Sequence, residues 1–271
     1  MVSKLLCPSR APDSRGLIQR VTPQSAGWRY VGFEVYQLTA GQTLAEKTGD
    51  TEVCLVFIGG KGSVKTDDAR FDDVGARLSP FERTPPYSVY IPAKNSFEVT
   101  AATDLELAVC KAPGKGLHPS RLIPPDQVMV ENRGKGQNSR YVQTILSDDS
   151  VAESLLVVEV FTDQGNTSSW PSHKHDQDNP PTETYLEETY YHRFNPPQGF
   201  CFQRVYTDDR SLDESMAVYD RDVVLVPRGY HPVATVAGYD NYYLNVMAGP
   251  TKRWIFTWEK DHAWINSEQY R

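Results

Sequence analysis

The chain has 271 residues, of which 39% are hydrophobic and 23% are charged, and its formal net charge at pH 7 is −7. This composition is typical of a soluble globular protein with one large or two ordinary domains, and the acidic balance without a basic cluster argues against a nucleic-acid partner. No apolar run approaches the roughly 20 residues of a membrane helix. The 4 cysteines are far apart and form no Cys-x-x-Cys pair, which favours the reducing cytoplasm.

Short β-branched and aromatic runs, separated by Gly, Pro, Asn and Asp, recur along the chain, and helical periodicity is almost absent. This pattern predicts an all-β fold of antiparallel sandwiches or barrels. In the first half we expect strands at residues 28–38, 52–59, 62–66, 88–91, 96–101 and 105–111. In the second half we expect them at residues 155–162, 187–194, 200–206, 216–218, 223–226, 231–236 and 242–247.

The two halves follow the same plan, which indicates an internal repeat. Residues 51–57 occupy the place that 187–191 take later, and 90–95 correspond to 225–230. We therefore predict an N-terminal segment (1–27), a first barrel (28–112), a connector (113–149) and a second barrel (150–271). The first barrel has no histidine and cannot hold a site of three imidazoles, so we expect it to be structural, packing against the second barrel or forming a homo-oligomer.

The predicted connector is rich in Gly, Pro and basic residues, among them Lys115, Arg133, Lys135 and Arg140. One interpretation makes it an anion clamp over the functional site. The favoured interpretation is a solvated linker between the two barrels, because such a composition is common in linkers.

Chemistry-bearing residues concentrate between positions 173 and 231, which contain four of the 6 histidines. In an extended strand His173 and His175 project to the same face. A carboxylate from the next strand and His231, which follows a Pro-x-Gly turn, would complete a site for a first-row transition metal. A His-x-His pair alone is usually a coincidence of composition; the added carboxylate and turn histidine make a metal site the stronger interpretation.

The carboxylate is either Glu187 or Glu188, which face opposite sides of one strand. Glu188 shares its face with Tyr190 and His192, so we predict that Glu188 is the ligand and that Glu187 faces solvent. For His192, a hydrogen-bonded core position is favoured over a role as a further ligand.

These motifs resemble the cupin superfamily, although the histidine–glutamate gap is longer here and a single residue, Tyr230, separates Gly229 from His231. More closely, the second half resembles the 5-deoxy-glucuronate isomerase family of inositol catabolism, through residues 172–176, 186–191, 195–208, 222–232 and 243–249. The resemblance implies a bicupin, with two double-stranded β-helix (jelly-roll) barrels in tandem, the first of them without metal ligands.

The resemblance also implies an aldose–ketose isomerase that converts 5-deoxy-D-glucuronate to 5-dehydro-2-deoxy-D-gluconate. It assigns one divalent metal ion (zinc, manganese or iron) to His173, His175, Glu188 and His231. Isomerisation needs a Lewis acid and a proton carrier. Candidates for the proton carrier are His192, Tyr190, Tyr206 and Tyr243. Candidates for binding the uronate carboxylate are Arg204, Arg228 and Lys174, although a surface ion pair is an equal alternative for the two arginines.

Two other classes of function remain open at this stage. The same ligands would suit a metal-dependent oxygenase, which oxygen uptake during turnover would reveal. A non-enzymatic sugar-binding cupin is the third class, although no helix-turn-helix pattern accompanies the barrels.

Overall fold

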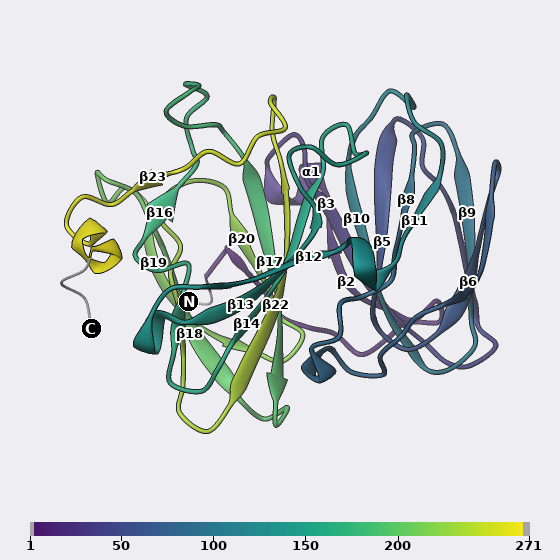
Figure 1. Ribbon diagram of the computed structural model, residues 1–271, viewed down its shortest axis with the longest axis horizontal. Coiled ribbons are helices and arrows are strands. Elements are labelled where there is room, and N and C mark those ends of the chain that lie inside the picture. Colours follow the sequence, from purple (N-terminus) through teal and green to yellow (C-terminus); the bar gives the residue numbers. More distant parts are fainter. Residues whose placement is uncertain (1–2, 268–271) are drawn as a thin grey trace. The chain divides into compact units, whose positions relative to one another are not determined.

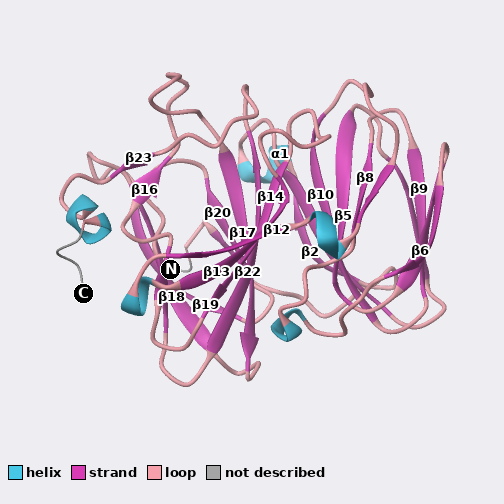
Figure 2. Ribbon diagram, in the orientation of Figure 1, coloured by secondary structure: helices cyan, strands magenta, loops and turns pink. Residues whose placement is uncertain are grey.

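The structure is a computed structural model that describes residues 3–267, and strands dominate it throughout (Figures 1 and 2). The helical elements are single turns, all of which connect strands except the last, which follows β23. They are α1 (Pro23–Ala26), η1 (Pro80–Glu82), η2 (Pro125–Gln127), η3 (Gly136–Asn138) and η4 (Ala263–Asn266). None of the helices in the described part of the chain is long and apolar enough to cross a membrane.

The chain divides into two compact units. The first, which we call the histidine unit, comprises Met1–Ser9, Val130–Gln143 and Val158–Arg271 as far as the structure describes them. The second, the apolar unit, comprises Arg10–Met129 and Thr144–Val157. These boundaries differ from the expected ones: the predicted segment 1–27 and the predicted connector 113–149 are each divided between the units. The outermost positions of the predicted segments, 1–2 and 268–271, lie outside the described residues.

The apolar unit contains a six-stranded and a four-stranded antiparallel sheet. In spatial order the larger sheet has β11 (Arg121–Ile123), β8 (Ser88–Ile91), β5 (Thr51–Gly59), β10 (Leu105–Pro113), β3 (Gly32–Leu38) and β2 (Leu17–Val21). The smaller sheet has β4 (Thr43–Lys47), β9 (Ser96–Ala101), β6 (Gly62–Thr66) and β7 (Arg70–Val74).

The histidine unit is built around a seven-stranded sheet, in which β13 and β14 each run through a unit boundary. Its order is β1 (Leu6–Cys7), β20 (Val223–Val226), β17 (Glu187–Asn195), β22 (Asp240–Ala248), β14 (Leu156–Thr162), β13 (Arg140–Leu146) and β12 (Met129–Arg133). A four-stranded sheet has β15 (Thr167–Ser168), β21 (Val233–Thr235), β18 (Phe200–Tyr206) and β19 (Asp213–Tyr219). A third, two-stranded sheet pairs β16 (His173–Lys174) with β23 (Thr257–Trp258).

The strand order repeats between the units, which confirms the predicted all-β fold of two related barrels. In the apolar unit β8, β5, β10 and β3 are neighbours, and in the histidine unit β20, β17, β22 and β14 follow the same order. The smaller sheets agree as well, with β4-β9-β6-β7 matched by β15-β21-β18-β19. Each barrel therefore repeats one eight-strand plan of the jelly-roll kind.

The two barrels differ in what fills their interiors. Val53 pairs with Ile91 across β5 and β8, and Glu188 pairs with Val226 across β17 and β20. This register places Val53 in the apolar unit where the histidine unit has Glu188. Two and four residues further on, Leu55 and Phe57 correspond to Tyr190 and His192, and all three apolar side chains belong to one buried cluster. The first barrel thus has a hydrocarbon core where the second has polar groups.

The predicted connector is not a plain solvated linker. It supplies β11, β12 and β13, and the last two belong to the seven-stranded sheet of the histidine unit, where β12 is the edge strand and β13 lies next to it. Because β13 begins at Arg140, this basic residue belongs to the barrel wall. Few residues of β12 are apolar, which explains why hydrophobic patterning did not predict it.

Candidate metal centre

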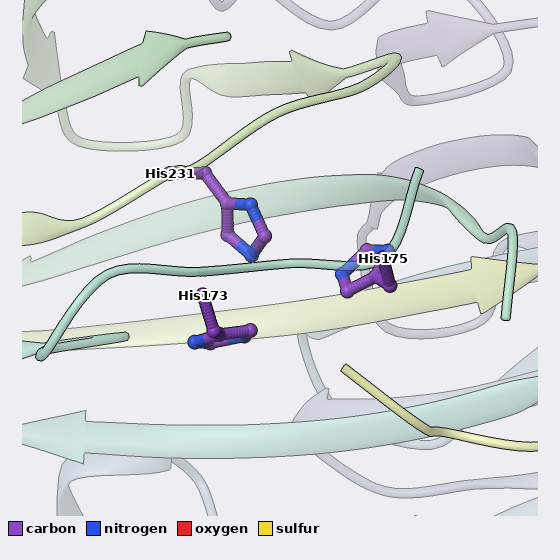
Figure 3. A group of neighbouring side chains, drawn as sticks. All are labelled: His173, His175 and His231. Atoms are coloured by element: carbon purple, nitrogen blue, oxygen red, sulfur yellow. The ribbon is translucent and has the colours of Figure 1, made fainter. Parts of the chain in front are cut away.

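Three imidazoles from separate parts of the histidine unit converge in its interior (Figure 3). His173 lies on β16, His175 follows that strand, and His231 follows the Pro-x-Gly turn after β20. One ring nitrogen from each lies within 4.8 Å of the other two. All three residues are buried, with exposed fractions of 7% or less. The structure therefore brings together the three histidines that the sequence selected.

Hydrogen bonds to the backbone fix the orientation of two of the rings. Nδ1 of His175 lies 3.0 Å from the carbonyl oxygen of Leu186, and Nδ1 of His231 lies 2.9 Å from that of Gly229. Since a carbonyl oxygen only accepts, each Nδ1 carries the proton and donates it. The lone pair of each Nε2 is therefore directed into the cluster, as a neutral histidine ligand requires.

Glu188 brings a carboxylate to the same point. Its Oε2 lies 3.1 Å from Nε2 of His175 and 3.3 Å from Nε2 of His231. With both Nδ1 atoms protonated, this arrangement sets two nitrogen lone pairs against a carboxylate, which is stable only when a proton or a metal cation lies between them. In the described part of the chain, Nδ1 of His173 and Nε2 of His231 are buried without a hydrogen-bond partner. The donor set therefore fits a divalent transition-metal ion.

The pKa values of these groups reflect burial and the single carboxylate. Burial, which penalises the imidazolium, lowers the pKa of His173 well below its usual range, and the neighbouring His231 and His175 lower it further. Burial also lowers the pKa of His231 to about 4. For His175 burial acts in the same direction, but the hydrogen bond and charge of Glu188 outweigh it and raise the pKa. Two of the three imidazoles are thus held neutral and ready to coordinate.

The prediction that Glu187 faces solvent is wrong. Glu187 is 1% exposed, and its neighbours Thr189 and Tyr191 on the same face of β17 are fully buried. Both faces of β17 are covered in the histidine unit, so the alternation separates two buried environments rather than core from solvent. The alternation still separates Glu188, which reaches the histidines, from Glu187, whose carboxylate accepts a hydrogen bond from Tyr185 at 3.5 Å.

Tyr190 and Tyr243 lie on the face of the sheet that carries Glu188. The ring centroid of Tyr190 is 5.7 Å from that of His231 and 4.9 Å from that of Tyr243. The Tyr190 hydroxyl is 2.9 Å from the hydroxyl of Ser169. Burial raises the pKa of both phenols, that of Tyr190 well above its ordinary value, so both remain protonated at neutral pH. They can therefore donate hydrogen bonds beside the cluster.

His192 lies deeper in the same barrel. Its two ring nitrogens lie 3.2 Å from the amide oxygen of Asn241 and 3.1 Å from that of Gln203. Burial lowers its pKa to about 4, so the ring is neutral at pH 7. These contacts fit the hydrogen-bonded core position that the sequence favoured for His192.

The structure does not bring the remaining predicted residues to the cluster. Gln203 faces the barrel interior through its contact with His192, so its neighbour Arg204 faces outward and pairs with Asp213 at 2.7 Å. The ring of Tyr206, on the same outer face, lies between the guanidinium groups of Arg204 and Arg210 at 4.1 and 4.4 Å.

Lys174 and Arg228 are also engaged away from the histidines. Lys174, adjacent to His173 in β16, projects to the opposite face and pairs with Asp208 at 2.7 Å and Asp176 at 3.3 Å. Arg228 is exposed, and its guanidinium lies 3.5 Å from the hydroxyl of Ser211. The charges of Lys174 and Arg204 are thus already paired with aspartates, and Arg228 lies at the surface.

Sequence reasoning missed an aromatic segment beside the cluster. Strand β23 pairs with β16 so that Trp258 is opposite His173, and the ring of His173 lies 4.7 Å from that of Phe256. Trp254 continues this row, with its ring 6.0 Å from that of Phe256. The signal was present in the sequence, because aromatic residues at positions 254, 256 and 258 alternate as on one face of an extended segment.

Two jelly-roll barrels in one chain, with a histidine and glutamate cluster inside the second, define the protein as a bicupin. The chain belongs to the KduI/IolB family, whose model matches residues 5–265.

Relatives in this family are similar to the chain over nearly its whole length. A 5-deoxy-glucuronate isomerase of Geobacillus kaustophilus is 58% identical over 264 residues, which cover 97% of this chain and 96% of that protein. A 5-deoxy-glucuronate isomerase of Bacillus subtilis is 50% identical over 250 residues, or 92% of each chain. An IolB-like protein from Salmonella typhimurium, solved by crystallography, has a TM-score of 0.95 at 63% identity, covering 97% of this chain and 99% of that one.

The fold alone is shared more widely. An oxalate decarboxylase of Bacillus subtilis, whose Mn(II) centres have been studied, has a TM-score of 0.65 at 14% identity, covering 95% of this chain and 80% of that one. At this identity the likeness supports the architecture of two cupin barrels and carries no argument about the reaction.

Proposed function

We propose that the protein is a metal-dependent aldose–ketose isomerase that converts 5-deoxy-D-glucuronate to 5-dehydro-2-deoxy-D-gluconate in inositol catabolism. The observation that carries the proposal is the convergence of three buried imidazoles and Glu188 inside the second barrel of a chain that is 58% identical to an isomerase of that name. His173, His175, Glu188 and His231 would hold one divalent ion, either zinc, manganese or iron.

When bound, the ion supplies a Lewis acid that polarises the substrate carbonyl. The residues around it have their own tasks. Glu188, whose Oε2 lies 3.1 and 3.3 Å from Nε2 of His175 and His231, would complete the donor set and offset part of the positive charge of the ion. The backbone carbonyls of Leu186 and Gly229 keep His175 and His231 in the tautomer that leaves Nε2 unprotonated.

The reaction moves the carbonyl from C1 to C2, so a proton must leave C2 and a proton must reach C1, while the hydroxyl at C2 loses its proton and the oxygen at C1 gains one. Tyr190 is suited to the oxygens, because its hydroxyl is protonated at neutral pH and is oriented by Ser169 at 2.9 Å. The aromatic row of Trp254, Phe256 and Trp258 shields His173 and thus limits water at this side of the site.

The test combines elemental analysis of the purified protein with an isomerisation assay on the uronate, run anaerobically with and without chelator. We expect about one divalent ion per chain, turnover without oxygen, and loss of turnover after chelation that metal restores. Full activity in a metal-depleted sample would contradict the proposal. A requirement for oxygen would favour a metal-dependent oxygenase instead.

A further inference from the structure

The proposed substrate has two functional ends. Its carbonyl lies at C1 and its carboxylate at C6, so a second anchor is needed away from the metal ligands. An arginine is the best match for a carboxylate, because its planar fork can donate two parallel hydrogen bonds. The three basic residues that the sequence suggested for this task do not reach the cluster.

Strand alternation places Arg140 on the inner face of the barrel. Its neighbour Tyr141 lies on the outer face, where its ring is 5.9 Å from that of Phe161, which in turn is 5.3 Å from Tyr242. Successive residues of a strand face opposite sides. Arg140 at the start of β13 therefore shares the inner face with Tyr243 on β22, which is next to Tyr242.

Two further observations place Arg140 beside the cluster. Its Nη1 donates to the carbonyl oxygen of Trp170 at 3.3 Å, three residues before His173. The positive charge of Arg140 also counteracts the rise in the pKa of Tyr243, on the same inner face.

In the described part of the chain Arg140 forms no ion pair with a carboxylate, in contrast to three other arginines of the histidine unit. Arg133, Arg193 and Arg204 each pair with an aspartate or glutamate. Among residues 3–267 the hydrogen bonds of Arg140 all come from Nη1, to the backbone and side-chain oxygens of Asn138 at 3.0 and 3.1 Å and to Trp170. One end of the guanidinium is thus anchored on neutral oxygens, and Nε and Nη2 are left to donate to an anion.

We propose that Arg140 binds the carboxylate of the uronate and thereby determines the specificity of the site for an acidic sugar. This inference rests on the proposed isomerase function. A half-buried guanidinium that has no counter-ion among the described residues is costly in a protein interior, and an anionic substrate provides the opposite charge. One interpretation of residues 113–149 was an anion clamp, and this proposal assigns that task to a single residue of the segment, Arg140 on β13.

The experiment compares R140Q and R140K with R204Q as a matched control, because Arg204 is an outward-facing arginine of the same unit. For each variant the KM and kcat for 5-deoxy-D-glucuronate are measured, together with the inhibition constant of the neutral analogue that carries a hydroxymethyl group in place of the carboxylate. Metal content and melting temperature are recorded in parallel.

We expect R140Q to raise the KM for the uronate about 10- to 100-fold, as the loss of a charge-assisted pair predicts. The neutral analogue should bind R140Q as it binds the wild type, and metal content should not change. R140K, which keeps the charge and loses the fork, should give an intermediate KM, and R204Q should match the wild type.

An unchanged KM in R140Q, or an equal loss of affinity for the uronate and the neutral analogue, would overturn the assignment while leaving the isomerase function intact. If R140Q does not fold, a KM of R140K equal to that of the wild type has the same meaning. A wild-type protein that does not isomerise the uronate would overturn the proposed function, and the assignment of Arg140 with it.

Discussion

Oε2 of Glu188 on β17 lies 3.1 Å from Nε2 of His175, which follows β16, and Glu188 is 2% exposed. A buried carboxylate and a nitrogen lone pair attract each other only through a shared cation. Stable binding of a divalent ion therefore depends on this pair, and on the face of β17 from which Glu188 projects.

The pair leads to a matched prediction for the two neighbouring glutamates. E188Q should weaken metal affinity more than about 100-fold, because even groups that only orient a ligand contribute about 10- to 100-fold. E187Q should retain the metal, since Glu187 faces away from the histidines. Elemental analysis of the two folded variants after dialysis gives the ratio of metal to protein. Equal metal content in both would contradict the assignment of Glu188 as a ligand.

Metal removal should also lower stability. A ligand that binds only the folded state adds about 2.7 kcal/mol at 100 times its dissociation constant, so chelated protein should melt at least about 5 °C lower than loaded protein. Calorimetry with and without chelator measures the difference. A variant with H173A and H231A should melt at the same temperature in both conditions, and a chelator effect that persists there would point to a different binding site.

The hydroxyl of Tyr190 should matter for turnover and not for metal binding. Y190F should lower kcat/KM about 10- to 100-fold, because it removes a donor beside the reacting oxygens. Metal content should stay constant, since Tyr190 is not one of the proposed metal ligands. The control is Y141F, whose ring lies on the outer face against Phe161. If Y190F and Y141F have the same activity, Tyr190 has no role in the reaction.

Patterning predicted the strands that bury an apolar face. The bounds of β6, β8, β9, β18 and β20 agree with the expected residues 62–66, 88–91, 96–101, 200–206 and 223–226. Short or polar edge strands were missed, because β12 and β7 bury few side chains and carry little hydrophobic signal. The position of Arg140 beside the site follows from the pairing of β13 with the sheet, which no local pattern encodes.

The candidate site was predictable where chemistry and spacing coincide. His173, His175 and His231 could be identified because a His-x-His pair, a carboxylate on the next strand and a histidine after a Pro-x-Gly turn together fit one metal-site geometry. Arg204 and Lys174 were chosen by residue type alone, and their true environment depends on aspartates that lie close only in the folded barrel. Residue type combined with spacing therefore selected the histidines that converge in the structure, whereas residue type alone selected basic residues that lie away from them.

The apolar unit contains an ion-pair network whose pH dependence can be predicted. Nζ of Lys111 lies 2.7 Å from Glu34 and 2.9 Å from Glu46. Burial raises the pKa of Glu46, but Lys111 and hydrogen bonds from Tyr36 and Arg15 outweigh it, so the pKa is lowered. A lowered pKa means that folding favours the carboxylate. This stabilisation is present above the unfolded pKa of about 4.3 and is lost as the pH falls through the folded value.

E46Q should therefore reduce the free energy of unfolding by about 1 kcal/mol at pH 7 and by much less near about pH 3.5. Urea denaturation at the two pH values measures this. D72N is the control, because Asp72 pairs with Arg70 on the open surface, where the two side chains are 59% and 65% exposed. An effect of E46Q that is independent of pH would show that packing, rather than charge, explains its contribution.

Gly229 links the backbone of the turn to the metal site. Its φ is +87°, and a Cβ there would lie 2.3 Å from the carbonyl oxygen of Tyr206. Its own carbonyl accepts the hydrogen bond of His231 at 2.9 Å. Gly238 is a matched control, because its φ is +89° and nothing lies within 4 Å of an added Cβ.

G238A should cost about 1 kcal/mol, the strain of a left-handed alanine, whereas G229A should cost at least about 3 kcal/mol because the clash adds to that strain. Moving the turn displaces His231, so G229A should also lose metal, and G238A should keep it. Denaturation and elemental analysis of both variants measure these effects. Equal stability and metal content would mean that the turn can shift without moving the ligand, and that the contact with Tyr206 does not position His231.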